Sequence, residues 1–151
     1  MSELKTPEEM LALCGEIPFA TKGRSMWPFV RDNPDAVRIG RIEKEIVKGD
    51  VILFRYQGRV LLHRVCGQDE NGFITRGDNC IACETGIAEE DVIGILTGVT
   101  RKGSIRTPGG IGYKLYKALW CSNRFFVRLT HMAVSLRRAV KRRLKRSGKK
   151  R

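Results

Sequence analysis

The sequence predicts a mainly β domain that begins with a short helix and ends in a basic, amphipathic helical extension. Short apolar runs separated by turn-forming residues dominate residues 36–106, which is typical of a chain of β-hairpins. A helix-start signature stands near the N-terminus. Residues 101–151 hold seventeen Lys or Arg and no acid, whereas the first hundred hold twelve basic and sixteen acidic residues, a net charge of −4. We therefore expect a compact β domain over residues 1–106 and a helical tail over residues 107–151.

The N-terminal helix is predicted from its capping residues. Thr6, Pro7 and Glu9 supply a cap, a first helical residue with a preset φ and a reciprocal acid. Gly15 is placed to end the helix. A short apolar run, Ile17–Ala20, then leads into a turn.

The central hairpin has the clearest β pattern. Val51–Tyr56 and Arg59–Val65 are expected to be paired strands, because the two residues between them, Gln57 and Gly58, suit a tight turn. Further strands are expected at residues 37–39, 73–75 and 91–100. A helix followed by hairpins, with no repeat of 20–50 residues, argues against a solenoid or propeller.

Composition excludes several classes of protein. The chain has 151 residues with an apolar fraction of 42%, enough for one domain with a real core. Five scattered cysteines do not form a disulfide framework. We find no secretory signal and no uncharged apolar run near the ~20 residues that span a bilayer. We expect a cytoplasmic protein.

The tail follows a helical period beyond the hinge-like stretch Thr107–Gly110. Its apolar positions recur every three or four residues, at Phe125, Leu129, Met132, Leu136 and Val140. Basic residues beside an apolar stripe suit an anionic membrane, so we expect residues 111–146 to bind the inner face of the membrane peripherally. Nucleic acid is the second expected partner. Alternatively, the apolar stripe packs on the domain.

Ser25 is the candidate nucleophile. It lies in the stretch 23–29 (GRSMWPF), where Gly23 frees the backbone before the serine and Pro28 stops any regular element after it. A serine held on such a turn presents its hydroxyl and its N–H, but the hydroxyl needs a base to act as a nucleophile. The alternative is an ordinary loop.

His63 is the candidate base, because the only other histidine, His131, lies in the tail. Neutral imidazole accepts a proton near pH 7. Asp78 or Glu84 could orient the imidazole and stabilise its charged form. The alternatives are a half-buried strand histidine and, for Asp78, a capped turn.

Cys80 and Cys83 form a C-x-x-C pair. No second pair completes a zinc site, and no βαβ unit supports a redox motif. We expect reduced thiols without a role, no metal and no cofactor.

Five short motifs in order resemble the signal peptidase I superfamily, the S24/S26 serine peptidases, over roughly residues 17–100. They are residues 23–29 (GRSMWPF), 48–54 (KGDVILF), 62–65 (LHRV), 73–79 (FITRGDN) and 92–94 (VIG). The histidine in LHRV resembles the endoplasmic-reticulum and archaeal type of signal peptidase, which has a histidine where bacterial enzymes have a lysine. The resemblance implies the compact β-fold shared by LexA and signal peptidases, with Ser25 as nucleophile and His63 as general base.

The resemblance also shows two departures. The family has an aspartate in its Gly-Asp-Asn turn, which Asp78 matches. It has a second aspartate about six residues later, and this chain has Glu84 there. Only a short soluble helix precedes Ser25, where signal peptidases carry a transmembrane helix. The implied function is a serine endopeptidase that cleaves an extended peptide or leader segment. The alternatives are a catalytically silent peptide- or membrane-binding module of the same fold and nucleic-acid binding through the tail. No helix-turn-helix pattern precedes the β domain, which argues against a LexA-like repressor.

Overall fold

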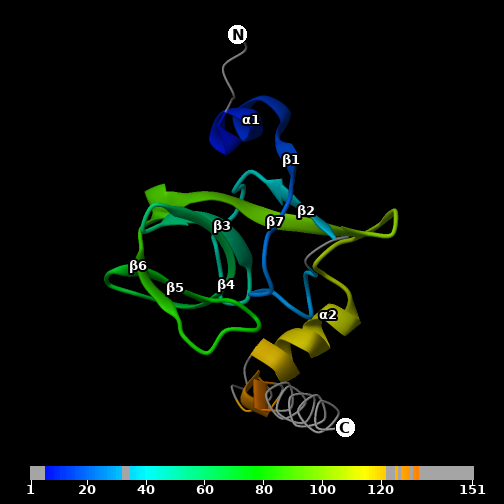
Figure 1. Ribbon diagram of the computed structural model, residues 1–151. Helices are drawn as coiled ribbons and strands as arrows, with labels where there is room; N and C mark the ends of the chain where they lie inside the picture. Colours follow the sequence, from blue (N-terminus) through cyan, green and yellow to red (C-terminus); the bar gives the residue numbers. More distant parts are fainter. Residues whose placement is uncertain (1–5, 32–34, 122–124, 126, 130, 133–151) are drawn as a thin grey trace, which may run out of the picture.

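The computed structural model describes residues 6–31, 35–121, 125, 127–129 and 131–132. Its described part is an eight-stranded antiparallel sheet with a helix at each end of the molecule (Figure 1). In chain order the elements are α1 (Pro7–Cys14), β1 (Glu16–Phe19), β2 (Ala36–Gly40), β3 (Val51–Tyr56), β4 (Arg59–Asp69), β5 (Gly72–Arg76), β6 (Glu84–Ile87), a 3₁₀ turn (Glu89–Asp91), β7 (Val92–Arg101), β8 (Ser104–Arg106), α2 (Ile111–Tyr116) and a π-helical turn (Lys117–Cys121). The predicted mainly β class with a short N-terminal helix is confirmed.

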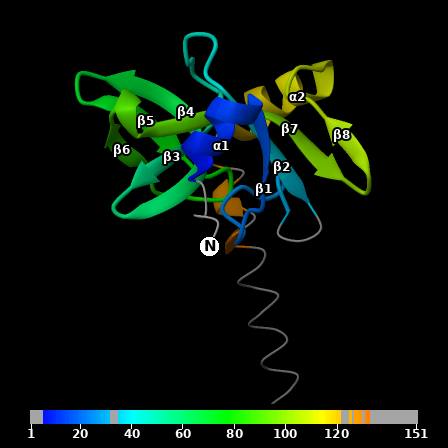
Figure 2. The same ribbon diagram turned by 90° about the horizontal axis from the view of Figure 1, so that it is seen from above.

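The strand order is β1-β2-β7-β3-β4-β5-β6, and β8 pairs with β7. Register shifts interrupt the pairing of β2 with β7, of β3 with β7 and of β4 with β5. Such irregularities bend a sheet. Figure 2 shows the result, with β3 to β6 on one side of the molecule and β8 and α2 on the other. The long strand β7 connects them, since it pairs with β3 in its first half and with β2 and β8 in its second.

The ends of α1 follow the sequence closely. Thr6 and Glu9 form the predicted capping box, since the Glu9 N–H donates to Thr6 Oγ1 at 3.3 Å and the Thr6 N–H donates to Glu9 Oε2 at 2.9 Å. Gly15 ends the helix with a φ of 77°. Leu11 is the helix residue buried in the core.

The β3–β4 hairpin also has its predicted turn. Tyr56 pairs with Arg59, and both turn residues, Gln57 and Gly58, have positive φ. The prediction for β4 was too short, because the strand continues past Val65 to Asp69. Its first half pairs with β3, and its second half pairs with β5.

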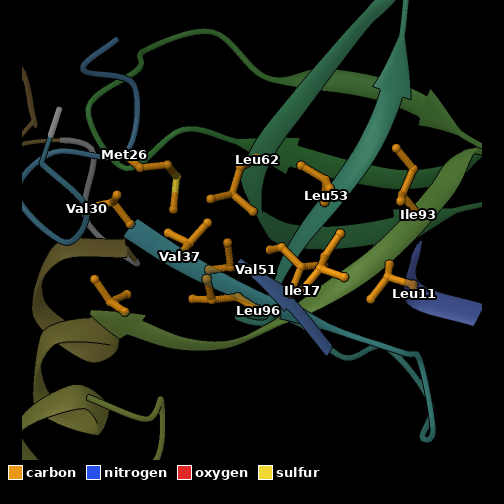
Figure 3. Packing of buried hydrophobic residues seen from close by; sticks show 12 residues of the cluster. Leu11, Ile17, Met26, Val30, Val37, Val51, Leu53, Leu62, Ile93 and Leu96 are labelled. Atoms are coloured by element: carbon orange, nitrogen blue, oxygen red, sulfur yellow. The ribbon is translucent and has the colours of Figure 1, made fainter. Parts of the chain in front are cut away.

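A cluster of buried apolar side chains joins the two sides of the sheet to the loop that carries Ser25. We call residues 20–31 the serine loop. Figure 3 shows Met26 and Val30 of this loop pointing into the cluster, near Leu62 and Val37. Burial of Met26 and Val30 therefore fixes the backbone on both sides of the serine.

Three strands were not predicted, namely β1, β6 and β8, whereas α2 lies within the predicted helical tail. The strand β6 has no apolar alternation, and it exists because β5 pairs with it. The helix α2 begins at Gly110 without a side-chain cap and spans six residues. Too short to be stable alone, it is held by the packing of its tyrosines on the β domain, as described below.

The tail is described only in part. Residues 125, 127–129 and 131–132 are helical, and the Val127 side chain is buried. The rest of the predicted helix, including Leu136 and Val140, lies outside the described residues, as does most of the range 111–146 that is predicted to bind a membrane. Within the part of the chain that the structure describes, no helix is both long and apolar enough to cross a membrane.

Candidate active site

The serine loop is held by hydrogen bonds to its carbonyl groups. Asn79, in the turn after β5, donates its N–H to Ser25 O at 2.7 Å and its side-chain amide to Arg24 O at 3.1 Å. Arg101 of β7 donates to Phe29 O at 3.0 Å. Gly23 enters the loop with a φ of 95°, a conformation that favours glycine. The backbone around Ser25 is thus fixed by two distant segments of the chain.

His63 lies on β4 with Glu84 beside it. The His63 Nδ1 and Glu84 Oε2 atoms are 2.9 Å apart, and the exposed fractions of the two side chains are 6% and 16%. Thr75 Oγ1 donates to the same carboxylate oxygen at 2.9 Å. Because an ionised carboxylate only accepts hydrogen bonds, Nδ1 carries the proton. In neutral His63 this leaves Nε2 as a proton acceptor.

The ionised form of Glu84 is the favoured one. Partial burial of Glu84 opposes its ionisation, but hydrogen bonds from His63 and Thr75, with the charge of His63, outweigh burial and hold the pKa of Glu84 below its ordinary value. Glu84 is therefore a carboxylate at neutral pH, as an orienting group for an imidazole must be.

Ser25 and His63 line the same small cavity of about 80 Å³. Gly77 lies between them, because a Cβ placed on Gly77 would stand 2.7 Å from Ser25 O and 3.0 Å from His63 Nε2. Within the described residues, neither the hydroxyl nor the N–H of Ser25 makes a hydrogen bond to protein. Both groups are therefore available to a molecule in the cavity.

Asp78 lies next to this site but is paired with a different side chain. Arg64 Nε donates to Asp78 Oδ1 at 2.8 Å, and Arg64 Nη2 donates to Asp78 Oδ2 at 2.7 Å. Both side chains are 2% exposed. Of the two carboxylates predicted as partners of His63, the structure brings Glu84 to the imidazole and Asp78 to Arg64.

Arg64 is the centre of an aromatic cluster that sequence reasoning missed. Its guanidinium carbon lies 5.2 Å from the centroid of the Phe29 ring, 5.5 Å from that of Tyr113 and 5.7 Å from that of Tyr116. Arg64 also donates to the Tyr113 hydroxyl at 2.7 Å. The Tyr116 hydroxyl donates to Asp78 Oδ2 at 2.8 Å. This cluster fastens α2 to the end of the serine loop.

His131 is a second contact that the sequence did not indicate. Its Nε2 lies 2.8 Å from Asn79 O, so the tail contacts the same residue that binds the serine loop. No local signal identifies such a contact, because the two residues are 52 positions apart.

The cysteines of the C-x-x-C pair face different surroundings. Cys80 lies beside the site, where its Sγ would be 2.8 Å from a Cβ on Gly77, and burial raises the pKa of its thiol. Cys83 lines a different cavity together with Cys66. In the described part of the chain, no group of three or more His, Cys, Asp or Glu side chains is arranged to hold a metal ion.

Comparing the chain with protein-family models, with curated proteins and with solved structures gives no match. Function is therefore inferred from the geometry of the site and from the sequence motifs.

Proposed function

We propose that the protein is a serine endopeptidase with the S24/S26, signal-peptidase-like fold, which cleaves an extended peptide or leader segment. One observation carries the proposal: Ser25 shares a cavity with His63, whose other ring nitrogen is bound by Glu84. A nucleophile, a base and a carboxylate that orients the base are the three parts that acyl transfer needs. Asp78 has a structural role in this proposal.

The proposed cycle uses these groups in two steps. Ser25 Oγ attacks the scissile carbonyl carbon while its proton passes to His63 Nε2, and the oxyanion accepts a hydrogen bond from the Ser25 N–H. His63 then gives the proton to the leaving amine as the C–N bond breaks. Water, deprotonated by His63, attacks the acyl-enzyme and releases the acid and free Ser25.

The substrate strand would add to the free edge of β4. Residues Arg59–His63 pair with β3 on one edge, while pairing with β5 begins at Arg64, and no strand in the described residues covers the other edge of Arg59–His63. Exposed edges accept extended peptides through main-chain hydrogen bonds. The adjoining cavity of about 80 Å³ is lined by Phe19, Met26 and Leu62, so it suits a small apolar side chain beside the cleaved bond.

The proposal gives Gly77 a defined effect on turnover. Gly77→Ala would bring a Cβ to 2.7 Å from the backbone of Ser25, so the serine loop or His63 must shift. We expect kcat to fall by about a hundredfold, since catalysis is sensitive to displacements of about 1 Å. Gly67→Ala is the matched control, because a Cβ there has open space, and it should keep its activity. Equal kcat values for both variants would show that Ser25 and His63 need not approach each other.

Glu84→Gln tests the orienting carboxylate. A glutamine amide can bond Nδ1 in either tautomer and cannot stabilise the imidazolium, so we expect kcat to fall by up to about 10⁴-fold. Steady-state kinetics of Glu84→Gln and of Asp78→Asn, measured side by side, check which carboxylate orients His63. A larger loss of kcat in Asp78→Asn, with the fold intact, would exchange the two roles.

The low pKa of Glu84 also predicts how its contribution to stability depends on pH. The ionised form is favoured in the folded state, so the contribution is complete above the ordinary value of 4.5 and is lost as the pH falls through the lower folded pKa. The difference in unfolding free energy between wild type and Glu84→Gln should therefore shrink below about pH 4.5. Urea unfolding from pH 7 to pH 3 measures it, and a constant difference would contradict the prediction.

Peptide cleavage tests the function itself. Wild type and Ser25→Ala are incubated with a library of leader-like peptides, and the products are mapped by mass spectrometry. Cleavage by wild type alone is expected. Peptide binding without cleavage, and unchanged in Ser25→Ala, would instead indicate a silent peptide-binding module.

A further inference from the structure

A second, larger cavity lies on the opposite side of β4 from His63. Successive side chains of a strand point to opposite faces, so His63 faces the small cavity and its neighbour Arg64 faces this one. Its volume is about 620 Å³, within the range of cavities that bind small molecules. The peptidase proposal makes no use of it.

The wall of this cavity is strongly basic. Five cationic side chains and one carboxylate line it, a net charge of +4: Lys48, Arg64, Arg76, Lys114, Lys117 and Asp78. The two oxygens of Asp78 accept hydrogen bonds from Arg64 and Tyr116. Asp78 is thus already bound to Arg64, and the cavity wall keeps a large excess of positive charge.

Two of these cations, Arg64 and Arg76, are buried, whereas Lys117 is half-buried and Lys48 and Lys114 are exposed at the rim. Arg76 is 7% exposed at the end of β5. The methylene groups of Lys117 cover Gly49, and its Nζ lies 5.8 Å from the centroid of the Tyr113 ring. Cations that line one cavity can bind phosphate oxygens through short charge-assisted hydrogen bonds.

The remaining wall is less polar. Val65, Ile74 and Ala118 contribute aliphatic groups, and Cys66 and Cys83 contribute thiols. A bare inorganic ion would leave this part of the cavity unfilled, whereas an anion attached to an organic group would fill both parts.

We propose that this cavity binds the phosphate group of an organic phosphate. Lys114 and Lys117 of α2 and the following turn, together with Arg76 and Lys48, would donate to the phosphate oxygens. The carrier is a phospholipid headgroup or a soluble phosphate ester. A lipid is included because an exposed apolar row of α2 and its continuation, Ile111, Leu115 and Leu119, is 54–86% exposed and adjoins Lys114.

The site does not depend on the peptidase proposal. Ser25 lies in the other cavity, so Ser25→Ala should bind the phosphate as wild type does. Failure of the peptidase proposal and failure of the phosphate site are therefore separate results.

The reactivity of the cysteines that line the cavity reports whether a ligand occupies it. Cys66 and Cys83 line the cavity, whereas Cys14 is exposed on α1. The full chain is treated with N-ethylmaleimide, and the labelling rate of each cysteine is followed by peptide mass spectrometry at matched ionic strength. The probes are glycerol 1-phosphate, vesicles of phosphatidylglycerol with phosphatidylcholine, and vesicles of phosphatidylcholine alone.

A saturating phosphate probe should slow labelling of Cys83 and Cys66 at least about fivefold and leave Cys14 unchanged. Protection by glycerol 1-phosphate identifies a soluble ester as sufficient, and protection by phosphatidylglycerol vesicles alone identifies a headgroup. In the Lys114→Gln, Lys117→Gln double variant, the half-protecting concentration should rise by about tenfold or more.

The control double variant removes the same charge elsewhere. Lys44 and Lys102 are exposed and do not line the cavity. In the Lys44→Gln, Lys102→Gln variant the half-protecting concentration of the phosphate probe should therefore stay close to the wild-type value. The proposal is overturned if no phosphate probe protects Cys66 or Cys83, or if the two double variants respond equally.

Discussion

Replacing Ser25 or His63 with alanine is expected to lower kcat for peptide cleavage by about a thousandfold or more. Ser25→Ala removes the attacking oxygen. His63→Ala removes the base that accepts its proton, and a serine hydroxyl without a base is a weak nucleophile at neutral pH. KM should change little, because neither group is proposed to supply ground-state binding.

The double variant distinguishes this mechanism from two independent contributions. Groups that act on one proton transfer are not additive, so Ser25→Ala, His63→Ala should be no slower than the slower single variant. Ser104→Ala, an exposed serine of β8, is the matched control and should retain full activity. A double variant that multiplies the two single losses would contradict a shared step.

Asp78→Ala is expected to give the largest loss of stability. Arg64 is 2% exposed, and removing Asp78 would leave its guanidinium buried without the bidentate carboxylate. Breaking a buried ion pair from one side costs about 3–5 kcal/mol. The loss should extend to α2, because Tyr116 also donates to Asp78. Urea unfolding followed by circular dichroism measures it.

An exposed ion pair provides the comparison. Glu8 and Arg55 are 2.5 Å apart, and their side chains are 38% and 51% exposed. Glu8→Ala should cost less than about 1 kcal/mol, because solvent screens such pairs. If Asp78→Ala is no more destabilising than Glu8→Ala, the Arg64 cluster does not fasten the serine loop and α2 to the sheet.

Local signals predicted the parts of the fold that depend on local chemistry. The capping residues placed α1 to within a residue, and Gln57-Gly58 placed the β3–β4 turn. The misses depend on distant residues. The second half of β4 and all of β6 exist through pairing with β5. The helix α2 lies within the predicted helical tail, but its contact with the domain depends on Arg64, 49 positions before Tyr113.

The residues of the candidate site also fall into those that local motifs indicate and those whose partners depend on distant parts of the chain. Motif order predicted Ser25 and His63, which the structure places on one cavity, but it could not decide between Asp78 and Glu84. That choice depends on register: Thr75 pairs with Glu84, which brings the longer glutamate side chain to His63. The turn meanwhile directs Asp78 to Arg64. Strand register between β5 and β6 has no signal in the sequence of either strand alone.

The mass of the protein during turnover tests directly whether Ser25 is the nucleophile. A library peptide that wild type cleaves is converted to its activated ester, mixed with the protein and quenched in acid before deacylation is complete. We expect one added acyl group on the peptide that contains Ser25, absent in Ser25→Ala and much reduced in His63→Ala. Ester turnover without an adduct, or an adduct that persists in Ser25→Ala, would contradict this role of Ser25.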